Sequence, residues 1–305
     1  MRVIRAASEL QAADRRVCIA IGVFDGVHLG HQEVLKGARR AAHSTGGVAV
    51  AVTFDRHPSA IVAPERTPPS IQTIPQKLRA IGTLGFDATL LLEFNDSLSK
   101  IPGETFVRNL ASDFERLESI SVGVGFTFGH KRSGDVILLK RLGAELGYRV
   151  DERVSLVSGG QVISSTRIRE EIRSGHLAAA EAMMGRPYAI EGKVEYGDQV
   201  GRALGFPTAN LNTVGSVLPP NGVYAVRLDR AQGVMNIGFR PSLAGIKPVL
   251  RVEVHLLDFE GDLYGQVLEV TPVVKLREEL RFQSLDELRH QISQDIVSAR
   301  HVLAA

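Results

Sequence analysis

Two different spacings of hydrophobic residues divide the chain near residue 185. Before that point, short apolar runs alternate with segments whose apolar residues recur every three or four positions, which predicts strands followed by helices. The βαβα alternation is typical of an α/β fold with a doubly wound parallel sheet. The expected strands are Val17 to Ile21, Val48 to Phe54, Ala88 to Phe94, Ser119 to Gly125 and Arg149 to Val157, and the expected helices are 31–44, 76–84, 103–117 and 135–146.

From Tyr188 onward, apolar and polar residues alternate, which predicts strands. Short strands so close together predict a small antiparallel β-barrel, followed by an amphipathic C-terminal helix from Ser284 to Leu303. Ser284 and Glu287 have the spacing of a capping box. The apolar face of this helix should comprise Leu285, Leu288, Ile292, Ile296 and Leu303. The expected strands are Ala189 to Glu195, Gly222 to Asp229, Val234 to Ile237, Val249 to Leu257 and Leu268 to Val274. We therefore expect two domains, 1–185 and 186–305.

Composition narrows the class of protein. The chain of 305 residues is 44% hydrophobic and 23% charged, with a formal net charge of +2, which fits a globular protein and argues against nucleic acid as its main partner. Its one cysteine, Cys18, excludes an intrachain disulfide and suits a reducing compartment. The apolar runs are too short for a membrane span. We expect a cytoplasmic protein with no membrane partner, and a homo-oligomer is compatible with the sequence.

The first expected strand leads into a glycine turn with two histidines, Gly22 to His31. A strand, a glycine turn and a helix start leave backbone N–H groups free for an anion, and His28 and His31 stand there. Zinc binding lacks the spacing and a third ligand, and neither a Walker A motif nor a Rossmann fingerprint is present. These absences favour a nucleotidyl-transfer site, in which histidine donors stabilise charge on an α-phosphate. The alternative is one capping and one exposed histidine.

A second candidate phosphate site precedes the helical pattern that runs to Gly175. Ser164, Ser165 and Thr166 offer hydroxyl and backbone donors before this helix. Arg167 and Arg169 follow these hydroxyl residues, and Arg169 is expected on a solvated face. A short helix, 176–184, should follow. Upstream, residues 56–75 contain five prolines and predict a long loop.

Motifs along nearly the whole chain resemble the bacterial bifunctional riboflavin kinase/FAD synthetases. In the first domain the resemblance rests on Gly22 to His31, Phe128 to Asp135 and Ser164 to Arg169. In the second it rests on Gly201 to Asn210, Asn221 to Tyr224, Asn236 to Gly238, Val252 to Asp258 and Asp262 to Gly265. The resemblance implies phosphorylation of riboflavin to FMN with release of ADP, and adenylylation of FMN to FAD with release of pyrophosphate. ATP is the co-substrate of both steps, and Mg²⁺ the metal.

In the first domain, the resemblance implies that His28, His31 and Arg167 act on the ATP phosphates. The residues expected to bind the nucleotide with them are Gly22, Phe24, Asp25, Gly30, Ser164, Ser165 and Thr166.

In the second domain, the resemblance implies that Glu253 is the catalytic base, although its strand pattern alone also suits a solvated face. Thr208 and Asn210 are two apart, so in an extended segment both side chains face the same way and can hold one Mg²⁺. Pro207 restricts the backbone before them, and Gly201 belongs to an expected flexible phosphate flap. Without the resemblance, residues 207–210 can equally be an ordinary polar turn, and Gly201 can equally be a glycine at a corner of the barrel.

Two positions of the first domain depart from the family pattern. Gly125 stands where Asp or Asn is common, and Arg56 replaces the first proline of Asp-Pro-His-Pro. A lost polar side chain at position 125 removes a group that could hold substrate. Two alternatives therefore stay open: a riboflavin kinase with an inactive first module, and a flavin- or nucleotide-binding regulator without turnover. Thr208, Asn210 and Glu253 together argue against the regulator.

Overall fold

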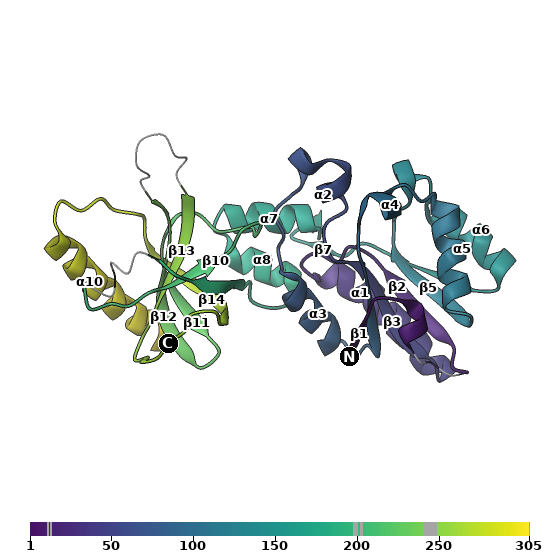
Figure 1. Cartoon of the computed structure of the whole chain (residues 1–305), viewed down its shortest axis with the longest axis horizontal. Helices are drawn as coiled ribbons and strands as arrows, with labels where there is room; N and C mark the ends of the chain where they lie inside the picture. The colour runs from purple at the N-terminus through teal and green to yellow at the C-terminus, as the bar shows by residue number, and fades with distance from the viewer. Residues whose placement is uncertain (11, 13, 198–200, 202–203, 241–248, 305) are drawn as a thin grey trace. The chain divides into compact units, whose positions relative to one another are not determined.

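The computed structural model describes residues 1–304 apart from 11, 13, 198–200, 202–203 and 241–248. The chain forms two compact units (Figure 1). The first unit comprises Met1–Ile168 with Met183–Gly185, and the second comprises Arg169–Ala182 with Arg186–Ala305.

The first unit is built on a parallel six-stranded sheet with the spatial order β1-β4-β3-β2-β5-β6. Its strands are β1 (Arg2–Ile4), β2 (Val17–Ile21), β3 (Val48–Phe54), β4 (Ala88–Leu92), β5 (Leu117–Gly123) and β6 (Arg149–Arg153). The main helices are α1 (Leu29–Thr45), α3 (Ile74–Thr83), α5 (Gly103–Asp113) and α6 (Val136–Leu146). Shorter elements are η1 (Ala7–Leu10), α2 (Ser59–Val62), η2 (Pro64–Arg66), α4 (Asp96–Ser99), η3 (His130–Arg132) and the hairpin of β7 (Val157–Ser158) and β8 (Gln161–Val162).

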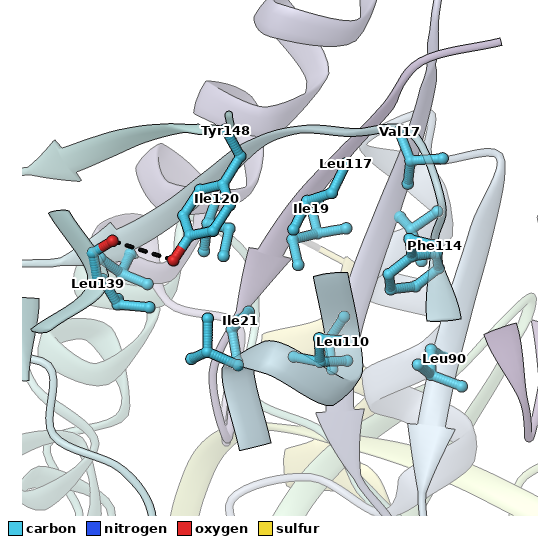
Figure 2. Close-up of a cluster of buried hydrophobic side chains, with 14 of the residues drawn as sticks. Val17, Ile19, Ile21, Leu90, Leu110, Phe114, Leu117, Ile120, Leu139 and Tyr148 are labelled. Atoms are coloured by element: carbon cyan, nitrogen blue, oxygen red, sulfur yellow. Dashed lines mark hydrogen bonds between the residues drawn. The ribbon is translucent and has the colours of Figure 1, made fainter. Parts of the chain in front are cut away.

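Alternate residues of the central strands build a core on each face of the sheet. Ile19 and Ile21 of β2 join one cluster with Leu110 of α5 and Leu139 of α6 (Figure 2). Tyr148 completes this cluster by donating a hydrogen bond from its hydroxyl to the Leu139 carbonyl at 2.9 Å. On the other face, Cys18, Ala20, Ala49 and Ala51 pack with Leu35 and Ala38 of α1 and Ile81 of α3. Small residues there let the helices approach closely.

Cys18 lies in the middle of β2 with none of its surface exposed. Burial raises the pKa of its thiol.

The second unit contains a closed antiparallel barrel with the order β10-β13-β12-β11-β14-β9. Its strands are β9 (Ile190–Glu195), β10 (Ala209–Asn212), β11 (Gly222–Leu228), β12 (Ala231–Arg240), β13 (Val249–Leu256) and β14 (Val267–Arg277). Helix α8 (Leu177–Met184) precedes the barrel and α10 (Leu285–Ala304) follows it. Helix α7 (Ser165–Arg173) spans the boundary between the two units in sequence.

The predicted fold class is confirmed: a doubly wound parallel sheet is followed by an antiparallel barrel and a C-terminal helix. The sequence pattern missed β1 and β10, which are only three and four residues long. It also continued the expected helix 103–117 into Leu117, where β5 begins. The expected strand Arg149 to Val157 is two separate pieces, β6 and β7.

Candidate functional site

The turn between β2 and α1 places both histidines at the carboxyl end of the parallel sheet. His28 is the N-cap of α1, and its Nδ1 accepts a hydrogen bond from the backbone N–H of His31 at 3.2 Å. The two rings stack with centroids 3.5 Å apart and an interplanar angle of 18°. Because Nδ1 of His28 supplies a lone pair, the neutral ring carries its proton on Nε2 and can donate from there.

Two residues of this turn have a strained backbone, and two of its glycines lie so close to aromatic rings that a Cβ would be crowded. Phe24 and Val27 are non-glycine residues with φ of 51° and 35°. Phe24 is buried, with its ring edge-on to His31 at 5.4 Å between centroids. A Cβ on Gly22 would lie 2.6 Å from the Phe24 ring, and one on Gly30 would lie 3.2 Å from the His28 ring. Phe24 therefore packs edge-on against His31, and the absence of side chains at the two glycines leaves room for the rings.

Asp25 connects the turn to two other segments. Its carboxylate accepts hydrogen bonds from the backbone N–H groups of Ile71 at 3.0 Å and Gln72 at 3.3 Å. Its carbonyl accepts a hydrogen bond from Ser165 Oγ at 2.8 Å. Asp25, expected to bind nucleotide, thus holds the end of the 56–75 segment and the start of α7 beside the β2–α1 turn.

Lys77 is a buried lysine next to the histidine turn that the sequence analysis did not single out. Its side chain is buried, and Nζ donates to the carbonyls of Val23 at 3.2 Å and Phe54 at 2.8 Å, and to Thr53 Oγ1 at 3.3 Å. Burial lowers the pKa of Lys77 to about 8, although the carboxylates of Asp25 and Asp55 act in the opposite direction. The available signal was a lysine four residues before Ile81, on the apolar face of α3.

The residues around the start of α7 contact either the histidine turn or the β7–β8 hairpin. Ser164 Oγ accepts a hydrogen bond from the Arg167 backbone N–H at 3.3 Å, while Ser165 reaches Asp25 and Thr166 is exposed. The Arg167 guanidinium donates to the carbonyls of Ser158 at 2.7 Å and Gln161 at 3.2 Å. Arg167, expected at the ATP phosphates, therefore ties the hairpin to α7. Arg169 is 5% exposed, so its expected place on a solvated face is wrong.

The two departures from the family pattern lie in open positions of the first unit. Arg56 forms an ion pair with Asp55 at 3.1 Å and is about half exposed. Burial alone would raise the pKa of Asp55, but hydrogen bonds from Arg56 and the Phe94 N–H lower it overall. Gly125 has a φ of 72°, and a Cβ there would meet no atom within 4 Å. This left-handed backbone suits glycine and tolerates Asn or Asp.

In the second unit, one row of residues crosses four strands of the barrel. Asn210 of β10 pairs in register with Glu253 of β13 and with Glu195 of β9, and Glu253 pairs with Asn236 of β12. Paired residues face the same side of a sheet, and this row alternates with the buried Leu211, Val252, Val254 and Ile237. Asn210 and Glu253 are therefore neighbours on the outer face of the barrel.

The segment that holds Thr208 and Asn210 fits a magnesium ion that also binds substrate oxygens. Asn210 Oδ1 is buried and has no hydrogen-bond partner among the described residues, and Thr208 lies two positions before it. The described residues contain no group of three or more His, Cys, Asp or Glu side chains able to hold a metal. Two neutral oxygens suit Mg²⁺ only if water and phosphate complete its shell, as in phosphoryl transfer.

Close backbone approaches surround these two side chains. A Cβ on Gly197 would lie 2.2 Å from Asn210 Nδ2, and one on Gly201 would lie 2.5 Å from the Phe206 carbonyl and 3.2 Å from Thr208 Oγ1. The glycine expected in the flap is therefore sterically required next to Thr208. Its neighbours 198–200 and 202–203 lie outside the described residues.

His255 was also missed, although it shares a strand and a face with Glu253. Its Nδ1 lies 2.8 Å from the Pro207 carbonyl, so the neutral ring donates there and holds the segment before β10 against β13. Beside this segment is a cavity of about 490 Å³. Its apolar wall includes Val194, Ala209, Val254 and Leu256, and Thr208 and Tyr264 also line it.

Comparison with known proteins decides the family. Residues 10–167 match the FAD synthetase family, and residues 184–303 match the riboflavin kinase family. A bifunctional riboflavin kinase/FMN adenylyltransferase from Escherichia coli strain K12 is 38% identical, over 98% of this chain and 97% of that protein. The chain belongs to this family. The resemblance seen in the sequence motifs is thereby confirmed, as are an enzyme class with both activities and a role in flavin-cofactor synthesis.

Other members of the bifunctional riboflavin kinase/FMN adenylyltransferase family match over similar lengths. The protein of the same name from Pseudomonas fluorescens is 37% identical over the whole of this chain and 98% of its own length. A crystal structure described as a macrolide-efflux protein from Streptococcus pneumoniae superposes with a TM-score of 0.80 at 27% identity, covering 98% of each chain. No helix in the described part of this flavin-synthesis enzyme is long and apolar enough to cross a membrane.

Proposed function

We propose that residues 186–305 phosphorylate riboflavin to FMN and that residues 1–185 adenylylate FMN to FAD, each at its own site. Both steps consume ATP, and they release ADP and pyrophosphate respectively. The observation that carries the kinase assignment is the buried, unpartnered Asn210 Oδ1 directly across the strand pair from Glu253. A single buried cysteine suits the cytoplasm, where we place the enzyme.

In the kinase step, Glu253 accepts the proton of the riboflavin 5′-hydroxyl as that oxygen attacks the γ-phosphate of ATP. Its position across from Asn210 brings a carboxylate beside the metal-binding segment, which places base and phosphate within one surface of the barrel. Mg²⁺ held by Thr208 and Asn210 would neutralise charge on the ATP phosphates. His255 and Pro207 keep the backbone of that segment fixed.

The cavity beside Thr208 suits the base and ribose of the nucleotide. Its apolar wall can cover a flat ring, and the adjacent Thr208 lies where the phosphates must emerge to meet the metal-binding segment. We therefore assign the cavity to ATP and the outer face around Glu253 to the riboflavin side chain.

In the adenylyltransferase step, the phosphate of FMN attacks the α-phosphate of ATP and pyrophosphate leaves. The nucleophile is already an anion at neutral pH, so this domain needs positioning and charge stabilisation more than a base. Nε2–H of His28 and the free backbone N–H groups at the start of α1 supply donors for the phosphates. Arg167 contributes by holding the β7–β8 hairpin in place.

The kinase assignment is tested with Glu253→Gln, assayed by chromatography of flavins after incubation with ATP and Mg²⁺. We expect FMN formation from riboflavin to fall by at least about 100-fold, because the amide cannot accept the proton, while supplied FMN is still converted to FAD. Glu195→Gln is the matched control, since Glu195 lies in the same row and should leave the kinase unchanged. Normal phosphorylation by Glu253→Gln would show that another group is the base.

The converse variant, His31→Ala, should lower FAD formation from FMN and leave riboflavin phosphorylation intact. The assay of wild-type protein with FMN also decides whether Gly125 and Arg56 have silenced the first domain. FAD and pyrophosphate among the products would rule out an inactive first domain. Equal loss of both activities in His31→Ala would instead indicate a folding defect.

A further inference from the structure

The loop that leaves β5 presents two cations on a strained and tightly held backbone. Lys131 and Arg132 are successive non-glycine residues in the left-handed region, with φ of 52° and 57°. Both side chains are exposed, and neither forms an ion pair or hydrogen bond with another residue of the described chain. Such strain persists only where the surrounding structure imposes it, and it concentrates at functional sites.

Several contacts impose this conformation on residues 129–133. Phe128 and Gly134 exchange two backbone hydrogen bonds of 3.0 Å, which close the loop at its base. The backbone N–H of His130 donates to the Ile101 carbonyl at 2.8 Å, and Ser133 Oγ accepts a hydrogen bond from the Gly103 N–H at 2.9 Å. The loop is therefore pinned to the segment before α5, with Lys131 and Arg132 at its exposed turn.

The order of the strands places this loop beside the histidine turn. From β2 the chain proceeds to β3 and β4 on one side of the sheet, and then returns to β5 and β6 on the other side. β2 and β5 are hydrogen-bonded neighbours. The loops that leave their adjacent carboxyl ends therefore run toward opposite sides of the sheet. Ligands of doubly wound sheets bind in the crevice at this switch point. One wall is Gly22–His31, and the loop after β5 forms the other.

The reaction proposed for this domain needs cations on that second wall. The phosphate of FMN and the triphosphate of ATP are both anions, and they must approach to bonding distance. Other cations near the carboxyl edge are already engaged: Lys77 by three oxygens, Arg167 by two carbonyls and Arg56 by Asp55. Lys131 and Arg132 have no such protein partner among the described residues.

We propose that Lys131 and Arg132 form the subsite for the phosphate of FMN. This inference rests on the proposed adenylyltransferase function of the first domain. The contacts of the loop fix the backbone of both residues before the substrate arrives, so binding has to order only their side chains. The phosphate of FMN is bound by the loop after β5, the triphosphate of ATP by the turn after β2, and the two meet in line above the sheet.

The test exploits the backbone strain. Lys131→Gly and Arg132→Gly remove the charge while placing the residue best suited to a left-handed backbone, so both variants should keep or raise the melting temperature. We expect the KM for FMN in FAD synthesis to rise roughly 10-fold in each variant and roughly 100-fold in the double variant, from loss of charge-assisted hydrogen bonds. The kcat and the KM for ATP should change by less than about twofold, and Lys131→Arg should retain low KM.

Glu115→Gly is the matched control. Glu115 also has a positive φ, 47°, and is exposed, but it precedes β5 at the amino end of the sheet. Its substitution should affect stability in the same direction and leave the KM for FMN unchanged. Riboflavin phosphorylation by each variant is the internal control for the second domain.

The proposal is overturned if the double variant keeps the wild-type KM for FMN. It is equally overturned if the change appears in the KM for ATP, or for pyrophosphate in the reverse reaction, since the loop would then bind the polyphosphate. Equilibrium dialysis with FMN separates this outcome from failure of the proposed function. A wild type that makes no FAD contradicts the function, whereas equal FMN binding by wild type and double variant contradicts the subsite.

Discussion

At the scale of single residues, Lys77 shows how one buried charge can shape a binding turn. Its Nζ joins the carbonyl of Val23, just after β2, to the carbonyl of Phe54 at the end of β3. Asp25 joins the same turn to residues 71–72. Lys77 and Asp25 thus both fix the strained turn that carries the histidines. Both contacts are made by the segment that runs from the proline-rich loop into α3.

Lys77→Met tests this role through pH. The pKa of Lys77 is about 8 in the folded protein, below its ordinary value of 10.5, so from pH 8 to 10.5 the unfolded chain binds more protons than the folded one. Stability of the wild type should therefore rise relative to Lys77→Met over that range, by up to about 1.4 kcal/mol per pH unit. Urea unfolding at pH 7.5 and 9.5 measures the difference.

Lys36→Met is the comparison variant for this measurement, because the Lys36 side chain is 44% exposed and pairs with Glu33. A stability difference between wild type and Lys77→Met that stays constant or falls with pH would contradict the lowered pKa of Lys77 in the folded protein. At pH 7.5 the variant should also lose FAD synthesis and retain riboflavin phosphorylation.

Single residues also mark the limit of prediction from sequence. The histidine pair could be predicted because a strand, a glycine turn and a helix follow one another directly along the chain. Lys77 and His255 could not, because their partners, Phe54 and Pro207, lie more than twenty residues away. Arg167 was expected at phosphate from the family resemblance, whereas its guanidinium contacts a hairpin that the pattern did not resolve.

At the scale of elements, α10 is attached to the barrel by apolar contacts and by one buried ion pair. Ala299 and Leu303 pack against Val223 and Ala225 of β11. Asp295, whose side chain is 6% exposed, pairs with the guanidinium of Arg277 through two bonds of 2.7 and 2.8 Å. A charge pair removed from water depends on both partners, because either one alone is left without compensation.

Asp295→Asn should therefore destabilise the second domain by about 3 kcal/mol, since it leaves the Arg277 charge without its counterion. The exposed ion pair between Arg300 and Asp258, on the same helix, is the control. Asp258→Asn should give no measurable change, because solvent screens that pair. Chemical denaturation followed by circular dichroism measures both. Equal effects of the two substitutions would contradict a special role for the buried pair.

The same helix explains which elements the sequence predicted correctly. The pattern placed α10 within one residue of its ends, and Ser284 Oγ does accept a hydrogen bond from the Glu287 N–H, while the Glu287 carboxylate accepts from Gln283. The predicted apolar face was wrong at Leu285, which is 63% exposed. Asp295 is buried instead, because Arg277 of β14 makes a charged position part of the interface. The periodicity of the sequence shows that position 295 is polar, but it does not show that Asp295 has a partner 18 residues away in Arg277.

At the scale of the whole molecule, the chain combines two units whose candidate sites are each built from their own elements. The histidine turn and the loop after β5 belong to the parallel-sheet unit, and Asn210 and Glu253 belong to the barrel unit. FMN is the product of one unit and the substrate of the other. If each site is complete, the two activities can be supplied by different molecules.

A mixture of His31→Ala and Glu253→Gln proteins should therefore convert riboflavin to FAD, although neither variant does so efficiently alone. FMN released by the first variant is the substrate of the second, so a lag should precede FAD formation and should shorten as protein concentration rises. Flavin chromatography over time measures the lag. Failure of the mixture, with each single activity intact, would mean that FMN passes between sites of one chain without release.

The single buried thiol of β2 makes this enzyme a ready background for fluorescence work. Cys18 is the one cysteine of the chain and is fully shielded, and burial raises the pKa of its thiol, so a maleimide dye should leave the native protein unlabelled. The chain also contains no tryptophan. One cysteine introduced on each domain would therefore carry a donor and an acceptor without competing sites. Energy transfer between them could then follow the domains through successive turnovers in single molecules.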